Sequence, residues 1–135
     1  MSNPITIVIE RAEGNFSAYV KDIDGITASG KSISEIKASI QDAILEYIET
    51  CKEYKLEIPQ ELIGKYQLIF ELDIQSLLTI YQGIFTKSAL EKITGINQKQ
   101  LWHYAQGLSK PRYAQRQKIE TALHRLGSEL VSLSL

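Results

Sequence analysis

The chain has a single cysteine, Cys51, in 135 residues, so no intramolecular disulfide can form. No set of Cys and His side chains has the spacing of a structural zinc site. No apolar run approaches the ~20 residues of a membrane span. The segment from Met1 to Arg11 lacks the basic start and the long apolar stretch of a signal peptide. These absences predict a cytoplasmic protein with no membrane partner, no metal and no cofactor.

Recognisable arrangements of catalytic residues are also missing. Neither His103 nor His124 has the Ser, Cys or acidic neighbours of a recognisable triad. Asp22 and Asp24 resemble the paired acids of a two-metal nuclease, but they fall in a predicted turn, with no further acid at a core position of a neighbouring strand. The sequence therefore favours a binding protein over an enzyme and indicates no catalytic residue.

Charge is distributed unevenly along the chain, although the net charge is only −1. Residues 1–72 hold seven Lys and Arg against twelve Asp and Glu, which gives −5. Residues 73–135 hold eight against four, which gives +4. This polarity indicates two surfaces for two partners, one of them polyanionic, although an uneven distribution can also arise by chance.

The acidic part has the patterns of an α+β domain. Alternation of apolar and polar side chains predicts strands at 5–9 and 16–20. A turn at 22–25 leads into a short third strand at 26–29, and residues 66–72 are interpreted as a fourth strand that returns to the sheet. Ser32, with Glu35 three residues later, forms a capping-box pattern that opens a helix ending near Tyr54. One face of that helix is apolar, through Ile33, Ile36, Ile40, Ile44, Ile48 and Cys51. The order predicts a β-β-β-α-β antiparallel sheet covered by one long helix.

The basic part has helical periodicity, with helices expected at about 74–82, 86–94, 97–106 and 112–126. Gly95 is placed to end one helix in a left-handed residue, and Asn97 caps the next, with Gln100 as its expected capping-box partner. Leu101 and Tyr104 are spaced to pack inward. The apolar tail, residues 129–135, is expected to pack against something, and a partner subunit is one candidate.

The outer face of this second helix and the loop after it carry residues suited to DNA. Glutamine bonds adenine edges, and lysine reaches guanine or phosphate; Pro111 is placed to open the next helix, beside cations that hold backbone phosphates. The DNA-binding candidates are Asn97, Gln98, Lys99, Trp102, His103, Gln106, Lys110 and Arg112.

The segment from Phe85 to Leu126 resembles the helix-turn-helix of the phage-repressor and Cro superfamily. The resemblance is carried by Gly95-Ile96-Asn97, Leu101, Gly107 and Pro111 at matching intervals. Glu91 and Thr94 depart from it, because the superfamily usually has a small residue and an apolar residue there. The alternative is a helical hairpin that only packs or dimerises.

Residues 5–60 resemble the N-terminal domain of HicB-type antitoxins. In that family a second strand passes through an Asp-x-x-Gly turn into a third strand and a capped helix. The matching residues are Tyr19, Val20, Asp22, Gly25, Gly30, Ser32 and Glu35, with Pro59 after the helix. Lys21 and Asp24 stand where the family usually has prolines, and Ser34 and Ile36 replace an acidic residue and an alanine.

This resemblance implies a partial ribonuclease-H-like fold without nuclease activity. Such proteins neutralise a HicA-like toxin, an mRNA ribonuclease, and bind double-stranded operator DNA as homodimers or higher homo-oligomers. Residues 1–72 would then bind the toxin, and residues 73–135 would bind DNA and dimerise. Acidic side chains suited to a basic partner are Asp22, Asp24, Asp42, Glu46, Glu49 and Glu53, each of which is otherwise a solvated surface charge.

Two other functions fit the same residues. A free-standing helix-turn-helix transcription regulator would use its N-terminal domain to sense a ligand or to dimerise. A purely structural interaction module would have no salt-dependent affinity for DNA.

Overall fold

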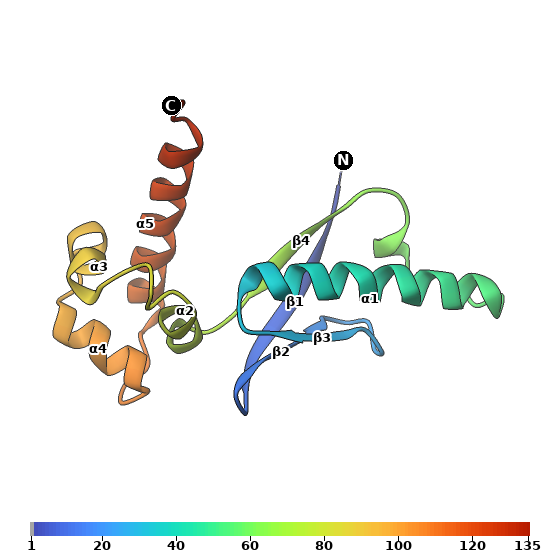
Figure 1. The fold of residues 1–135 in the computed structure, drawn as a ribbon, viewed down its shortest axis with the longest axis horizontal. Coiled ribbons are helices and arrows are strands. Elements are labelled where there is room, and N and C mark those ends of the chain that lie inside the picture. The colour runs from blue at the N-terminus through green and yellow to red at the C-terminus, as the bar shows by residue number, and fades with distance from the viewer. Residues whose placement is uncertain (1) are drawn as a thin grey trace. The chain divides into compact units, whose positions relative to one another are not determined.

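The computed structural model describes residues 2–135, and the chain divides into two compact units. The sheet unit ends at Asp73 and the helical unit begins at Ile74. The fold class is α+β, with a four-stranded mixed sheet and five α-helices in the described chain (Figure 1). Within residues 2–135, no helix has the length and apolar character needed to cross a membrane.

The sheet has the strand order β3-β2-β1-β4. Its strands are β1 (Asn3–Ala12), β2 (Asn15–Val20), β3 (Thr27–Gly30) and β4 (Tyr66–Glu71). The first three strands pair antiparallel, as expected. The expectation of a wholly antiparallel sheet is wrong, because β4 pairs parallel with β1. Helix α1 (Ile33–Glu53) returns the chain after β3, so β4 runs in the direction of β3 and β1, and parallel pairing needs such a crossover.

Helix α1 (Ile33–Glu53) lies over one face of the sheet (Figure 1). Its N-terminus is fixed by Ser32, whose hydroxyl accepts a hydrogen bond from the Glu35 N–H at 3.1 Å. The Glu35 carboxylate accepts the Lys31 N–H at 2.6 Å rather than that of Ser32 itself. The predicted capping residues therefore cap the helix, with the reciprocal bond shifted by one residue.

The core of the sheet unit lies between α1 and the sheet. Ile36, Ile40 and Ile44 of α1 are fully buried, and alternate residues of β1 and β2 face them. Each such isoleucine contributes about 1.5–3 kcal/mol relative to an exposed side chain. A short 3-10 helix, η1 (Gln60–Leu62), which the sequence pattern did not predict, adds buried Leu62.

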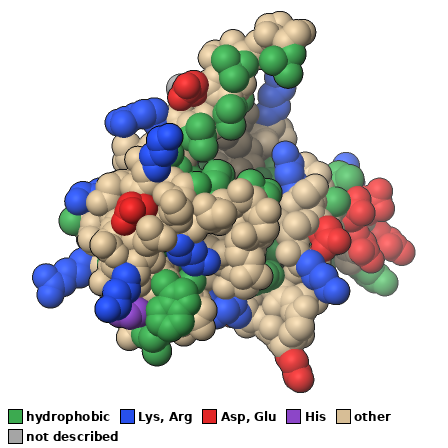
Figure 2. All heavy atoms as spheres, turned by 60° about the vertical axis from the view of Figure 1, so that its left-hand side comes forward, with side chains coloured by type: hydrophobic (Ala, Val, Ile, Leu, Met, Phe, Trp, Pro, Cys, Tyr) green, Lys and Arg blue, Asp and Glu red, His purple; other side chains and the backbone are tan. Residues whose placement is uncertain are grey.

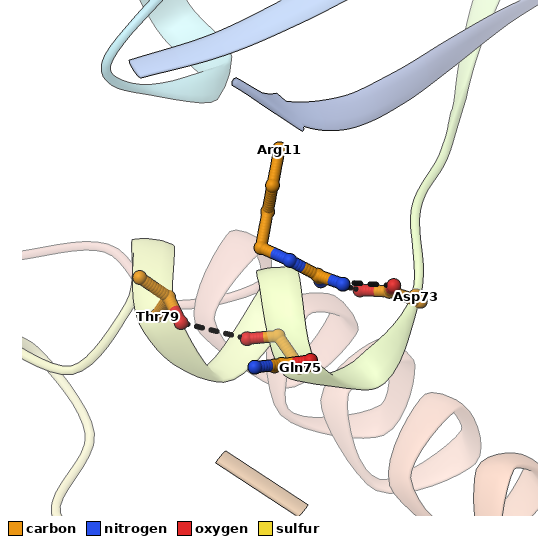
Figure 3. A network of polar contacts seen from close by, with 4 residues as sticks. All are labelled: Arg11, Asp73, Gln75 and Thr79. Carbon is orange, nitrogen blue, oxygen red and sulfur yellow. Dashed lines mark hydrogen bonds and ion pairs between the residues drawn. The ribbon is translucent and has the colours of Figure 1, made fainter. Parts of the chain in front are cut away.

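The ends of β1 and β4 are joined by an ion pair. Nη1 of Arg11 contacts the two carboxylate oxygens of Asp73 at 2.7 and 2.9 Å (Figure 3). Because the two strands are parallel neighbours, their carboxyl ends meet at one edge of the sheet. Both side chains are exposed, so the pair is worth about 0–1 kcal/mol. It holds the end of β4 beside β1.

The helical unit consists of α2 (Ile74–Ile80), α3 (Lys87–Thr94), α4 (Gln98–Gln106) and α5 (Tyr113–Val131). Its buried core contains Leu78, Leu90, Ile96, Leu101, Tyr104 and Ile119. The last helix is longer than expected, because Gly127 does not adopt a positive φ and the helix continues through it. In Figure 1 the C-terminal half of α5 projects past α3 and α4.

Candidate nucleic-acid interface

A three-residue turn connects α3 to α4. Gly95 ends α3 in the left-handed conformation, with φ 77°, and its N–H donates to the Glu91 carbonyl at 2.8 Å. Ile96 is 3% exposed and anchors the turn in the core. Asn97 caps α4, its side-chain oxygen accepting the Lys99 N–H at 2.8 Å. The predicted glycine stop, apolar anchor and asparagine cap are therefore all present.

The predicted capping-box partner is wrong. Gln100 does not bond back to Asn97, because its side-chain amide donates to the Ser109 hydroxyl at 3.0 Å. The Glu91 carboxylate on α3 instead accepts the Gln98 N–H at 2.8 Å. A negative charge at the start of α4 also interacts favourably with the helix dipole.

The two departures from the phage-repressor pattern both bind backbone groups of the turn. Glu91 accepts the first free N–H of α4. The Thr94 hydroxyl donates to the Leu90 carbonyl at 2.6 Å and accepts the Ile96 N–H at 3.1 Å. Polar residues at these positions therefore stabilise the turn through hydrogen bonds.

Replacing Glu91 with alanine should destabilise the helical unit by about 1 kcal/mol, because the change removes a charge-assisted cap of α4. Urea denaturation followed by circular dichroism measures the effect. The matched control is Glu120→Ala on α5, whose exposed carboxylate lies 4.0 Å from His124, and whose loss should cost less than about 0.5 kcal/mol. Equal effects of the two changes would contradict the anchoring role of Glu91.

The inner side of α4 is held firmly. Leu101 is 0% exposed and Tyr104 is 5% exposed, both within the core of the helical unit. Gly107 ends the helix with φ 75°, and a Cβ there would lie 2.8 Å from Nε2 of Gln75 on α2. The predicted inward packing of Leu101 and Tyr104 is confirmed.

The outer side of α4 presents Lys99, Trp102, His103 and Gln106, which we call the α4 strip. Their i, i+3, i+4, i+7 spacing puts them on one side of the helix. Lys99 and Gln106 are exposed and Trp102 is 48% exposed. His103 is half-buried, with its ring centroid 5.5 Å from that of Trp102.

The remaining candidates lie at the two ends of α4. Asn97 and Gln98 are exposed at its start, although the Gln98 amide approaches Glu91 at 3.5 Å. Lys110 and Arg112 are exposed between α4 and α5, and Arg112 is the N-cap of α5, with no side-chain capping bond. Pro111 therefore precedes the N-cap rather than opening the helix.

Sequence reasoning missed two residues on the first turn of α5. The Arg116 guanidinium lies 5.8 Å from the centroid of the Tyr113 ring, and both side chains are exposed. A planar cation stacked on an aromatic ring is a common contact surface for nucleic acid. The i, i+3 spacing of Tyr113 and Arg116, next to Arg112, was the sequence signal that could have identified this pair.

Positive charge dominates the helical unit. From Ile74 to the C-terminus there are eight basic residues against three acidic ones. In Figure 2, which brings this unit forward, Lys and Arg side chains predominate on the visible face. The basic residues are Lys87, Lys92, Lys99, Lys110, Arg112, Arg116, Lys118 and Arg125.

In the sheet unit, the six candidate acids fall into two groups. Asp42, Glu46, Glu49 and Glu53 are exposed along the outer side of α1, at intervals of four, three and four residues. Asp22 and Asp24 are exposed in the turn between β2 and β3, where Asp22 has φ 67°.

The pKa of Tyr47 is raised from 10.0, mainly by burial, then by Cys51, and also by the nearby Asp24.

Exposed apolar residues accompany the acids of α1, and the sequence analysis missed them. Leu45 is 57% exposed and lies within one helical turn of Asp42, Glu46 and Glu49. Tyr54 and Leu56 are 67% and 59% exposed just after the helix. The sequence signal for this surface was Leu45, a leucine that lies outside the apolar face formed by the isoleucines of α1.

Asp22 and Asp24 are the pair of acids that the sequence analysis compares with a two-metal nuclease site. Within residues 2–135, no three His, Cys, Asp or Glu side chains are grouped so that they could hold a metal ion.

Comparisons with protein-family models, curated proteins and solved structures find no match to this chain.

Proposed function

We propose that this chain is an antitoxin of the HicB type. Its helical unit binds double-stranded operator DNA as a homodimer and represses transcription, and its sheet unit binds and neutralises a small basic HicA-like ribonuclease. It has no catalytic activity of its own. The observation that carries the proposal is the α4 strip, in which three of the four side chains are exposed and His103 is half-buried, while Leu101 and Tyr104 are buried behind it.

The DNA-binding role follows from the chemistry of the strip. Lys99, in the first turn of α4, reaches guanine acceptors or phosphate, and Gln98 beside it has an amide that bonds an adenine edge in two places. A helix held by a buried apolar side fits the major groove, with its first turns nearest the bases. Lys110, Arg112 and Arg116 supply phosphate contacts that fix the protein on the duplex.

The role of the sheet unit follows from the outer side of α1. Exposed Leu45 is flanked by acidic side chains, so the surface combines an apolar centre with a charged rim, as protein interfaces commonly do. A ribonuclease that binds mRNA is basic, and acids on its partner accelerate encounter and align the two proteins.

A free-standing regulator is the second candidate, and one observation favours it. The face of the sheet opposite α1 bears the exposed apolar residues Tyr19 and Ile69, a surface for dimerisation or ligand binding. The neighbouring gene distinguishes the two candidates. A basic reading frame of ~60–90 residues with a single histidine supports the antitoxin, and a small toxin of this size suits the standard interface area.

Salt dependence of DNA binding tests the proposal. The full chain should bind the duplex upstream of its own gene, and log affinity should fall with log salt by about 0.9 for each phosphate contact. With about four to six contacts in each copy, fluorescence anisotropy should record a slope between roughly −3.5 and −5.5 for each copy bound. A scrambled duplex of the same length is the control. A flat salt dependence, or equal affinity for both duplexes, would contradict operator binding.

A further inference from the structure

An apolar groove in the helical unit has no assigned role. It has a volume of about 310 Å³ and lies between α2, the start of α3 and the C-terminal half of α5. Leu77, Tyr81, Phe85, Leu126 and Leu130 are among its nine lining residues. Figure 2 shows hydrophobic side chains along the projecting end of this unit.

The lining has the wrong chemistry for a small polar ligand. Among the nine residues, the Tyr81 hydroxyl is the single polar side-chain group, and none carries a charge. Small-molecule sites combine an apolar wall with several convergent polar groups that fix the orientation of the ligand. The groove is therefore suited to apolar side chains.

The segment that follows the groove supplies such side chains. Leu130 lines the groove, and the next residues, Val131, Leu133 and Leu135, are 87%, 61% and fully exposed. From Leu126 to Leu135 there is one charged residue, Glu129, whereas the preceding half of α5 carries three basic residues, Arg116, Lys118 and Arg125, against Glu120. Two copies can approach at this end without the repulsion that their basic surfaces would cause elsewhere.

We propose that the C-terminal segment of one copy, residues 130–135, packs into the apolar groove of a second copy. The groove and the segment adjoin on one surface, so a two-fold axis lets each copy fill the groove of the other. The nine lining residues and the five residues after Leu130 form the apolar centre of this interface, and polar neighbours supply its rim. This inference specifies the dimer that the proposed function assumes, but it requires neither DNA nor toxin.

The first test measures the mass of the full chain by light scattering at micromolar concentration. The native chain should be a dimer, and Leu130→Asp with Leu133→Asp should give a monomer with an unchanged circular dichroism spectrum. The matched control is Leu56→Asp, because Leu56 is 59% exposed and Leu130 is 56% exposed. A monomeric native chain, or a dimer that survives the double substitution, would overturn the proposal.

Crosslinking tests the geometry independently of folding. Copies with Leu133→Cys are mixed with copies with Gln82→Cys, next to Tyr81, on a Cys51→Ser background. A short bismaleimide should join the unlike copies at least several-fold more efficiently than it joins like copies. Equal yields, or a small molecule retained in the groove in native mass spectrometry, would overturn it. Neither test involves DNA. A protein that forms this dimer but does not bind the operator would therefore contradict the proposed function and leave the dimer inference intact.

Discussion

Replacing Lys99 and His103 with alanine is expected to remove most of the affinity for the operator duplex. Lys99 is exposed, and His103 lies beside Trp102 on the same side of α4. A good base contact is worth about 1–3 kcal/mol, so the loss of two such contacts should weaken binding by roughly a hundredfold or more. Anisotropy titration at fixed salt measures the loss, and circular dichroism should show an unchanged fold.

The chain offers a matched control for this experiment. Lys118→Ala with His124→Ala removes the same two side-chain types from exposed positions on α5. It should lower affinity by no more than about tenfold, through one phosphate contact, and should retain discrimination between operator and scrambled duplexes. Binding of the protein partner should be unchanged in both variants. Comparable losses in the two would indicate that charge alone, rather than the α4 strip, accounts for DNA binding.

Leu101→Ala is expected to have the largest effect on stability. Leu101 is 0% exposed at the centre of the helical core, and a cavity of this kind costs about 2–5 kcal/mol. Because a small domain is stable by only about 5–15 kcal/mol, α3, α4 and α5 should lose much of their protection from hydrogen exchange. Helix α1 belongs to the other compact unit and should keep its protection.

Leu108→Ala is the control for this prediction. Leu108 is 66% exposed, so its truncation should cost less than about 0.5 kcal/mol. Equal stability of the two variants would mean that Leu101 does not hold α4 in place. Loss of protection in α1 in the Leu101 variant would mean that the two units do not unfold independently.

Local features of the fold could be predicted from the sequence. The isoleucine stripe of α1, the cap at Ser32 and the left-handed stop at Gly95 each depend on residues within one helical turn of one another. Alternation also identified the first two strands, and turn signals and the order of elements identified the other two. Alternation could not give the direction of β4, because apolar alternation is the same in parallel and antiparallel strands.

Long-range hydrogen bonds account for much of what was missed in the candidate site. Gln100 fits a capping box by spacing, but Ser109 lies nine residues away and takes its amide. Glu91 departs from the expected pattern, yet its carboxylate reaches the start of α4, seven residues away. Leu45 could not be placed from helical spacing alone, because a leucine off the main stripe is either half-covered by another element or open to solvent.

The central claim is that the α4 strip faces a duplex, and Trp102 tests it most directly because it is the single tryptophan of the chain. Acrylamide quenching of its fluorescence should be strong in the free protein, where Trp102 is 48% exposed. Saturating operator duplex should lower the quenching constant at least twofold, with the midpoint found by anisotropy. A duplex that binds while the quenching of Trp102 stays unchanged would contradict the account.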